Sequence, residues 1–417
     1  MTIETTAARE PETRVIVSRL LAAGPDADFA RHLARFGAFD PAAAAPRLLA
    51  ELEASGLTGR GGAGFAAWRK CAATADARDS SPRARRVVIG NGAEGEPFSR
   101  KDETLLRNAP HLVIDGLLAA AAAVGASELY LYAGEPGLSA IHGAVAERAD
   151  GAGIRVTAAA DTFLSGQASA VVNAIATGRP LPRDPVGRLS ESGLRGRPTL
   201  LHNVETLAHI GLIARYGADW FRAAGTAADP GTRLVTVAGD VPRAQVLEVH
   251  GGARIDAVLE AAGADPSRIS AVLVGGYHGA WLTADQLGTA LSPEALTPYG
   301  AHPGAGILLA LDRTRCAVQT TAEIIDYLAG QSARQCGPCL FGLPALAASW
   351  RDLAAGAVPG AAPGEAPHRA WTLADAVDGR GACAHPDGTA RLSRSALRVF
   401  AADIEQHRNG RCLRAAH

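Results

Sequence analysis

The chain has 417 residues, 47% of them hydrophobic, so it is long enough to form two or three domains with substantial cores. Its formal net charge is −1, from 41 basic and 42 acidic residues, which argues against nucleic acid or an anionic membrane as a partner. The first residues carry several charges and no long apolar run, which argues against a signal peptide and predicts a cytoplasmic location. The alanine-rich run near residues 117–124 is too short to span a bilayer, so no membrane insertion is expected.

A glycine-rich stretch from Thr58 to Phe65 is the first strong signal. Four of the six residues 59–64 are glycine, which lets a flat or phosphorylated ligand approach main-chain N–H groups closely. Residues 65–75 lack proline and glycine and predict a helix, whose free N-terminal N–H groups favour an anion. Lys70 in this helix would add a positive charge for a phosphate. The alternative is a glycine-rich surface turn, because isolated glycine motifs often match by chance.

Strands and helices alternate through the following part of the chain. A buried strand at residues 86–89 leads into the polar loop 90–97, where ligands of open α/β sheets commonly bind. Asn91, Glu94 and Glu96 in this loop carry groups that can hydrogen-bond a heteroaromatic ring or a sugar hydroxyl, although solvated turn residues are the alternative. The alternation predicts a mostly parallel sheet with helices on both faces. The other expected strands are 128–132 and 154–158, and the expected helices are 46–55, 111–124, 139–148 and 167–177.

The second half of the chain has a different texture. A long loop at residues 178–198 precedes a helix that opens at 202–206, where Asn203 has the same hydrogen-bonding capacity as Asn91. Beyond residue 232, a hairpin, a helix and another strand suggest a compact β-grasp-like module. The expected elements are the hairpin strands 233–238 and 245–249, the helix 255–261, the strands 271–274 and 306–311, the helical segments 316–353 and 393–407, and a linker at 356–367.

Six cysteines in a cytoplasmic chain favour thiols or metal ligands over disulfides. Cys336 and Cys339 are separated by two residues, a spacing that can place both thiolates on one metal or cluster, and Cys383 could join them. A [4Fe–4S] cluster normally needs four thiolates, so a redox dithiol or ordinary thiols remain as alternatives. Their apolar or terminal surroundings indicate that the other three are ordinary thiols: Cys71, Cys316 and Cys412.

In this order, the motifs resemble the flavin-bearing NADH dehydrogenase subunit of respiratory complex I and the related diaphorase subunits of NAD-linked hydrogenases and formate dehydrogenases. The resemblance covers residues 46–410. It implies a Rossmann-like α/β FMN domain at 46–225, a β-grasp, soluble-ligand-binding-like domain at 230–312, and an all-α iron–sulfur domain at 313–417, after an N-terminal extension at 1–45. It rests on Ser55–Leu57, Gly59–Phe65, Lys70, Asn91–Pro97, Lys101-Asp102, Pro110–Leu112, Ser192–Leu194, Gly196, Pro198, Asn203–Thr206, Gln335-Cys336, Pro338-Cys339 and Cys383.

The resemblance also implies individual roles. The family passes a hydride from NADH to FMN and then single electrons to the cluster, so a ferredoxin-like or other iron–sulfur partner is expected. Glu96 would face the nicotinamide nucleotide as the catalytic residue, and Cys336, Cys339 and Cys383 would hold the cluster. The residues expected to bind FMN are Gly59, Arg60, Gly61, Gly62, Ala63, Gly64, Phe65, Lys70, Asn91, Glu94, Gly166, Asn203 and Thr206.

The cluster loop departs from the family pattern, because Ala333 stands where its first cysteine is expected. Only three thiolates remain. The fourth ligand of a cluster would then be His385, water or a residue of a partner; otherwise the site would hold a [3Fe–4S] form or no cluster. The loss of one thiolate should also shift the potential of any cluster bound here.

The nucleotide site departs as well. Gln167-Ala168 follows Gly166 where the family has two glutamates, Pro185 and Arg188 replace a lysine and an adenine-stacking phenylalanine, and Ala93 replaces an aspartate. A stacked aromatic contributes about 1–3 kcal/mol, so NADH should bind one or two orders of magnitude more weakly unless Arg188 stacks or binds a 2′-phosphate. The leading hypothesis is an FMN-dependent oxidoreductase subunit using NAD(P)H or a replacement donor. A non-catalytic scaffold subunit and an NADPH-preferring diaphorase are the alternatives.

Overall fold

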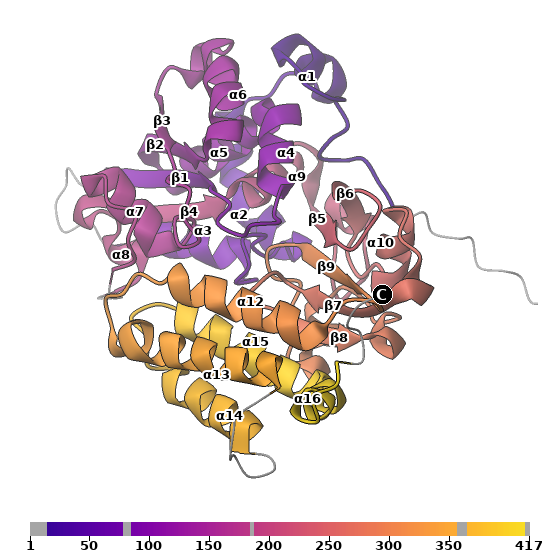
Figure 1. The fold of residues 1–417 in the computed structure, drawn as a ribbon. Coiled ribbons are helices and arrows are strands. Elements are labelled where there is room, and N and C mark those ends of the chain that lie inside the picture. The colour runs from indigo at the N-terminus through magenta and orange to yellow at the C-terminus, as the bar shows by residue number, and fades with distance from the viewer. Residues whose placement is uncertain (1–14, 78–84, 184–186, 357–364, 413–417) are drawn as a thin grey trace, which may run out of the picture.

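The computed structural model describes residues 15–77, 85–183, 187–356 and 365–412 (Figure 1). The first sheet has four parallel strands in the order β3-β2-β1-β4. Asn91 in β1 pairs with Asn203 in β4, so both amides lie at the carboxyl edge of the sheet. The strands are β1 (Arg86–Gly92), β2 (Ala126–Ala133), β3 (Ile154–Ala158) and β4 (Thr199–Asn203).

Helices cover both faces of this sheet, as the alternation of elements predicted. Val88 faces the larger core, which α2, α5 and α9 complete. Val87 and Ile89 point to the opposite face, where α7 packs, because successive side chains of a strand alternate between faces. The helices of this part are α1 (Phe29–Phe36), α2 (Pro41–Ser55), α3 (Ala67–Ala75), α4 (Lys101–Asn108), α5 (Pro110–Val124), α6 (Glu135–Ala146), α7 (Ala168–Thr177), α8 (Leu189–Ser192) and α9 (Val204–Arg222).

A second, five-stranded sheet has the order β6-β5-β9-β7-β8 and mixes parallel and antiparallel pairs. The predicted hairpin is confirmed as β5 paired with β6. One face of the sheet carries its own hydrophobic core, which includes residues of α10. The elements are β5 (Thr232–Gly239), β6 (Gln245–His250), α10 (Ile255–Ala261), β7 (Ile269–Val274), β8 (Ala280–Thr283), α11 (Pro293–Leu296) and β9 (Ile307–Asp312).

Helices form the rest of the molecule and lie below both sheets in Figure 1. The indole N–H of Trp350 in α13 donates to the hydroxyl of Ser393 in α15 at 2.9 Å, inside their common core. The backbone N–H of Trp281 in β8 donates to the Ser395 hydroxyl at 2.8 Å and ties these helices to the second sheet. The helices are α12 (Ala317–Gly330), α13 (Leu343–Ala355), α14 (Glu365–Val377), α15 (His385–Val399) and α16 (Ala401–Arg408).

Several predicted bounds are wrong. Residues 90–92 continue β1, α2 begins at Pro41 rather than Pro46, and residues 365–367 belong to α14 rather than to a linker. The helical segment 316–353 is interrupted at residues 331–337, and the loop 178–198 contains α8. Strands β4 and β8 were missed because both are short, and β4 ends in a histidine and an asparagine that do not favour strands.

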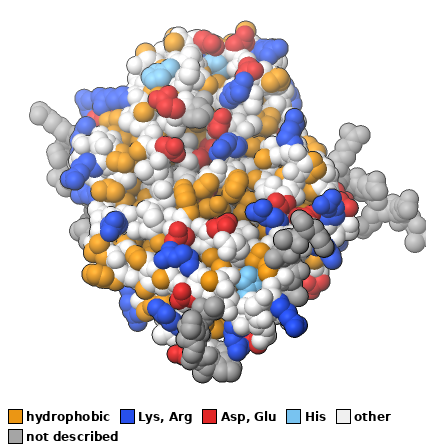
Figure 2. Space-filling model, in the orientation of Figure 1, with side chains coloured by type: hydrophobic (Ala, Val, Ile, Leu, Met, Phe, Trp, Pro, Cys, Tyr) orange, Lys and Arg blue, Asp and Glu red, His pale blue; other side chains and the backbone are white. Residues whose placement is uncertain are grey.

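Hydrophobic, basic and acidic side chains are mixed on the face in Figure 2, with no field of a single charge, in keeping with the small net charge. Within the described residues, no helix has both the length and the apolar character needed to cross a membrane.

Candidate functional site

The glycine-rich loop is a protruding bend with a closed base. A β-bridge joins Thr58 to Ala66, and the Gly59 N–H donates to the Phe65 carbonyl at 2.9 Å. Gly62 and Gly64 have φ values of 109° and 61°, a region that favours glycine. Residues 61–65 are exposed, so backbone in this bend is accessible to a ligand.

Four of the predicted FMN residues meet beneath this bend. A Cβ on Gly61 would lie only 3.1 Å from the Cβ of Asn203, so the loop packs directly against that side chain. The Asn203 amide donates to the Asn91 carbonyl at 3.2 Å, and the Asn91 amide donates to the Gly166 carbonyl at 2.8 Å. The arrangement therefore brings glycine backbone and both asparagines together at the carboxyl ends of β1 and β4, where ligands of parallel sheets bind.

Arg60 and Thr206 hold the loop in place from behind. The Arg60 N–H donates to the Thr206 hydroxyl at 2.9 Å, and the Arg60 guanidinium donates to the Thr232 carbonyl at 3.1 Å. Both side chains are buried, and burial lowers the pKa of Arg60 to about 10. The side chain of Arg60 thus points toward the second sheet, so cofactor contact by Arg60 and Thr206 stays a prediction while their structural role is visible.

Lys70 lies on α3 without a compensating charge. Within the described residues its ammonium group makes no ion pair, and burial lowers its pKa. Burial, and then the charge of Lys70, lower the pKa of the neighbouring His202 to about 3, so that ring is neutral. A half-buried cation without a counter-ion is electrostatically unfavourable, and an anionic ligand would relieve this cost. The site therefore fits a phosphate group, such as that of FMN.

A buried ionic network fixes Asn203. The Lys101 ammonium lies 2.7 Å from the Asp102 carboxylate and 2.9 Å from that of Glu205, and it donates to the Asn203 amide oxygen at 3.3 Å. Burial raises the pKa of Asp102 to about 7, against the lowering effect of Lys101. Glu205 also accepts the Leu234 N–H of β5 at 2.8 Å, so the network joins the asparagine to the second sheet. Sequence spacing did not predict this network, because Lys101 and Asp102 lie 101 to 104 residues from Asn203 and Glu205.

Glu94 and Glu96 have different surroundings. Glu94 accepts hydrogen bonds from the Ser99 hydroxyl and, at 2.9 Å, from the Glu103 N–H in the first turn of α4. Glu96 accepts the Tyr277 N–H at 3.0 and 3.1 Å, and a Cβ on Gly276 would collide with its carboxylate at 2.6 Å. Burial raises the pKa of Glu96 to about 7. Glu96 is therefore a carboxyl group that titrates near neutrality, between the loop after β1 and the turn after β7.

The three predicted cluster cysteines lie near one another, in the turns before α13 and α15. The Cys339 thiol is buried, and burial together with Cys336 and Cys383 raises its pKa to about 12. The backbone of Arg334, which has a φ of 54°, hydrogen-bonds to the Cys339 sulfur. A thiol set gathered from residues 336–339 and from the turn before α15 fits the chemistry of an iron–sulfur cluster.

The chain matches known families over both of these regions. Residues 52–212, which contain Glu96 and every predicted FMN position, match the Nuo51 FMN-binding domain. Residues 319–407, which contain the three cysteines, match the NADH-ubiquinone oxidoreductase-F iron-sulfur binding region. An NADH-quinone oxidoreductase subunit of Streptomyces coelicolor is 30% identical over 382 residues, covering 87% of this chain and 83% of the relative. The chain belongs to the NADH-quinone oxidoreductase-F family. It therefore carries an FMN-binding domain and an iron–sulfur binding region, as predicted.

Further relatives agree with this assignment. The corresponding protein of Mycobacterium tuberculosis is 29% identical over 374 residues, covering 85% of this chain and 83% of the relative. A chain of an NAD⁺-reducing [NiFe]-hydrogenase in its H₂-reduced state superposes with a TM-score of 0.76 and 28% identity over 88% of this chain. This chain spans 63% of the length of that hydrogenase chain. The mixed α/β fold with its added helices is thus that of flavin-binding diaphorases.

The structure shows what surrounds two of the departures from the family pattern, Gln167 and Arg188. The Gln167 side chain accepts the N–H groups of Ser169 and Ala170 at 2.8 and 3.0 Å and caps α7. Arg188 is exposed just before α8 and forms no ion pair within the described part of the chain. Pro185 lies outside the described residues. Gln167 therefore acts as a helix cap, whereas the exposed Arg188 has no carboxylate partner among the residues that the structure describes.

His385 does not face the cluster as a free ligand, although the sequence made it a candidate. Its Nδ1 lies 3.0 Å from Nε2 of His278, and its Nε2 lies 2.8 Å from the Leu328 carbonyl oxygen. Both ring nitrogens are engaged, so ligation would require the ring to give up one of these contacts. Ala333 packs against the same hydrophobic core as Cys336, which leaves the position of the fourth thiolate apolar.

Replacing Ala333 by cysteine should raise the iron and acid-labile sulfide content of the anaerobically purified protein, because a fourth thiolate completes a cubane site. The measurement is iron and sulfide per chain, with EPR of the reduced protein. Ala329→Cys adds a thiol to α12 outside the loop and should leave the iron content at the wild-type value. Equal iron in wild type and Ala333→Cys would show that the missing thiolate does not limit the cluster.

Glu96→Gln should remove a pH dependence of stability. The pKa of this carboxyl is raised in the folded state, so its contribution is complete below the unfolded value of 4.5 and is lost as pH rises through about 7. The loss amounts to at most about 3 kcal/mol, from 1.36 kcal/mol per pKa unit. Chemical denaturation of both proteins at about pH 5 and pH 8 measures it. The difference in unfolding free energy, wild type minus variant, should fall with pH; a constant difference would contradict the assignment.

Proposed function

We propose that this chain oxidises a nicotinamide nucleotide, with NADH as the leading donor, and passes the electrons singly to an iron–sulfur cluster and then to a partner subunit. The observation that carries the proposal is the exposed glycine bend seated on Asn203, beside Asn91 and the unpaired Lys70. Bound FMN would supply the conversion between hydride transfer and single-electron transfer. The bend would bind the flavin, and Lys70 would neutralise its phosphate.

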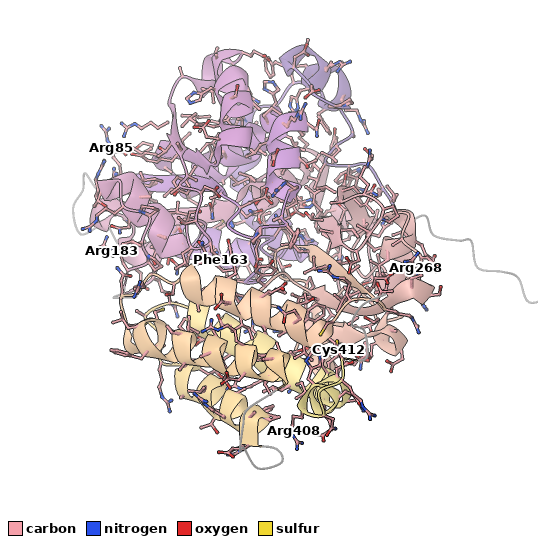
Figure 3. All side chains as sticks on the ribbon, in the orientation of Figure 1. Arg85, Phe163, Arg183, Arg268, Arg408 and Cys412 are labelled. Carbon is pink, nitrogen blue, oxygen red and sulfur yellow. The ribbon has the colours of Figure 1, made fainter. Side chains whose placement is uncertain are left out.

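The arrangement of parts supports this function. We assign FMN binding to residues 46–225 in a Rossmann-like domain, a β-grasp fold to 230–312, and the cluster to a helical bundle at 313–417. Phe163, labelled in Figure 3, lies between α12 and the part of the molecule that is built on the first sheet. Its ring contacts the rings of His278 and His385. These ring contacts connect the part of the chain that contains Glu96 with the helices that carry the cysteines. In the proposal, Glu96 contacts the nucleotide and exchanges a proton near neutral pH.

The related proteins named above are a quinone oxidoreductase subunit and a hydrogenase chain. By that analogy we infer a partner with its own iron–sulfur cluster, of ferredoxin type or another electron-transfer subunit. A cytoplasmic location remains our prediction from the sequence.

The test is the visible spectrum of the anaerobically purified protein, reconstituted with FMN if needed, before and after nucleotide addition. The proposal expects bound flavin that is bleached by NADH. Absence of flavin after reconstitution would overturn it. Bound flavin that neither NADH nor NADPH bleaches would favour the scaffold alternative instead.

One observation favours a second candidate, an NADPH-preferring diaphorase. The exposed guanidinium of Arg188 can pair with a 2′-phosphate, which only NADPH carries. Titration of the flavin with each nucleotide separates the two donors. If NADPH is preferred, Arg188→Ala should weaken NADPH binding and leave NADH binding nearly unchanged.

A further inference from the structure

Three potential metal ligands, two of them cysteines that the sequence indicated to be ordinary thiols, lie together at the end of the helical group. Cys316 immediately precedes α12, His407 lies in the last turn of α16, and Cys412 follows that helix. Their ligand atoms all lie within 4.8 Å of one another. Figure 3 shows Cys412 near α16 and one end of α12. This grouping is a reason to reconsider the interpretation of Cys316 and Cys412 as ordinary thiols.

The imidazole of His407 is oriented for ligation. Its Nδ1 lies 2.8 Å from the Ala354 carbonyl oxygen, which can only accept, so Nδ1 carries the proton. The lone pair of Nε2 is thereby directed at the Cys316 sulfur, 3.2 Å away. Metal-bound histidines commonly donate their other N–H to a carbonyl in this way. The ring is buried, so its orientation is fixed by the protein rather than by solvent.

The Cys316 sulfur lies at the N-terminus of α12, although burial raises the pKa of this thiol, so an ion bound here would have to displace its proton. Its sulfur accepts the Gln319 N–H at 3.3 Å and caps the N-terminus of α12, where the helix dipole favours negative charge. Bond lengths of tetrahedral zinc place a sulfur and a nitrogen ligand about 3.6 Å apart, close to the separation found here. The group thus needs only small shifts to enclose an ion.

We propose that Cys316, His407 and Cys412 bind a zinc ion that is separate from the iron–sulfur site of Cys336, Cys339 and Cys383. Two thiolates and one imidazole are ligands that select Zn²⁺ over hard cations such as Mg²⁺ and Ca²⁺. Water would complete the tetrahedron. The ion would fasten the end of α16 to the start of α12, next to the Ala354 carbonyl of α13. None of these residues belongs to the flavin or cluster sites, so the ion would join these helices without taking part in electron transfer.

The experiment is metal analysis of the full-length protein, purified anaerobically without chelators, together with its flavin and iron content. Wild type should hold one zinc per chain, and Cys412→Ser should lose it while keeping flavin and iron. Asn409→Ala, an exposed change between His407 and Cys412, should keep the zinc. The double variant Cys336→Ser/Cys339→Ser should also keep it, which separates this site from zinc trapped at the cluster cysteines.

Cobalt provides a readout that does not depend on a variant folding well. Co²⁺ added to zinc-depleted wild type should give thiolate charge-transfer and tetrahedral d–d absorption, and Cys412→Ser should not. Zinc should also raise the thermal midpoint of wild type but not of Cys412→Ser. Zinc retained in Cys412→Ser, absence of cobalt–thiolate bands, or a Cys316–Cys412 disulfide in the anaerobic protein would each overturn the proposal.

Discussion

Lys70→Ala is expected to weaken FMN binding about 10- to 100-fold, because a hydrogen bond to a charged group contributes about 1.5–3 kcal/mol. Lys70 is the cation on α3 that burial leaves without a carboxylate partner in the described structure. Its loss would leave the flavin phosphate with the backbone N–H groups of the glycine bend alone. The measurement is the dissociation constant of FMN, from quenching of its fluorescence as apoprotein is added.

Arg69→Ala is the matched control, since it removes the neighbouring, exposed cation of the same helix. It should change FMN affinity less than twofold at moderate salt, where exposed charges are screened. The apoprotein with Lys70→Ala should be as stable as wild type or slightly more stable, because the unpaired charge is costly. Wild-type affinity in Lys70→Ala would show that the phosphate binds elsewhere; a loss of apoprotein stability would assign Lys70 a structural role.

The flavin site was predictable where its residues are neighbours in the chain. The bend at residues 59–64 is rich in glycine, which indicates a close approach of its backbone to a ligand. Asn91 follows an apolar run that predicts a buried strand. The pairing that brings Asn91 beside Asn203 was not predicted, because strand β4 was missed. The direction of the Arg60 side chain was not predictable, because it depends on the carbonyl groups of residues 230 and 232, at and just before the start of β5.

Long-range contacts explain what the sequence did not show. Lys101 and Glu205 lie far apart in the chain, and only the packing of α4 against α9 makes them an ion pair. Cys316 and His407 are likewise separated by most of the helical group. A periodic pattern or a local motif carries no information on contacts between residues that are distant in the chain. Residues that come together through tertiary packing therefore need the structure, even when each is conspicuous in the sequence.

The same dependence on packing makes one glycine critical for the floor of the flavin site. Helices α5 and α9 cross where Gly116 meets the backbone of Leu207, about one turn beyond Asn203. A Cβ on Gly116 would lie 1.7 Å from the Leu207 carbonyl oxygen, and a Cβ on Gly211 would lie 3.1 Å from the Gly116 nitrogen. The two helices can approach this closely only because neither carries a side chain at the crossing.

Gly116→Ala should therefore destabilise the protein by about 3 kcal/mol, the upper end of the usual cost of overpacking, even though alanine favours a helix by about 1 kcal/mol. Separation of α9 from α5 would also displace Asn203, so FMN affinity should fall together with stability. Chemical denaturation and flavin titration measure the two effects. Gly143→Ala in α6 is the control: a Cβ there meets nothing within 4 Å, so it should stabilise by about 0.5–1 kcal/mol. If both variants were stabilised equally, the close crossing would be disproved, and with it the account of how Asn203 is held.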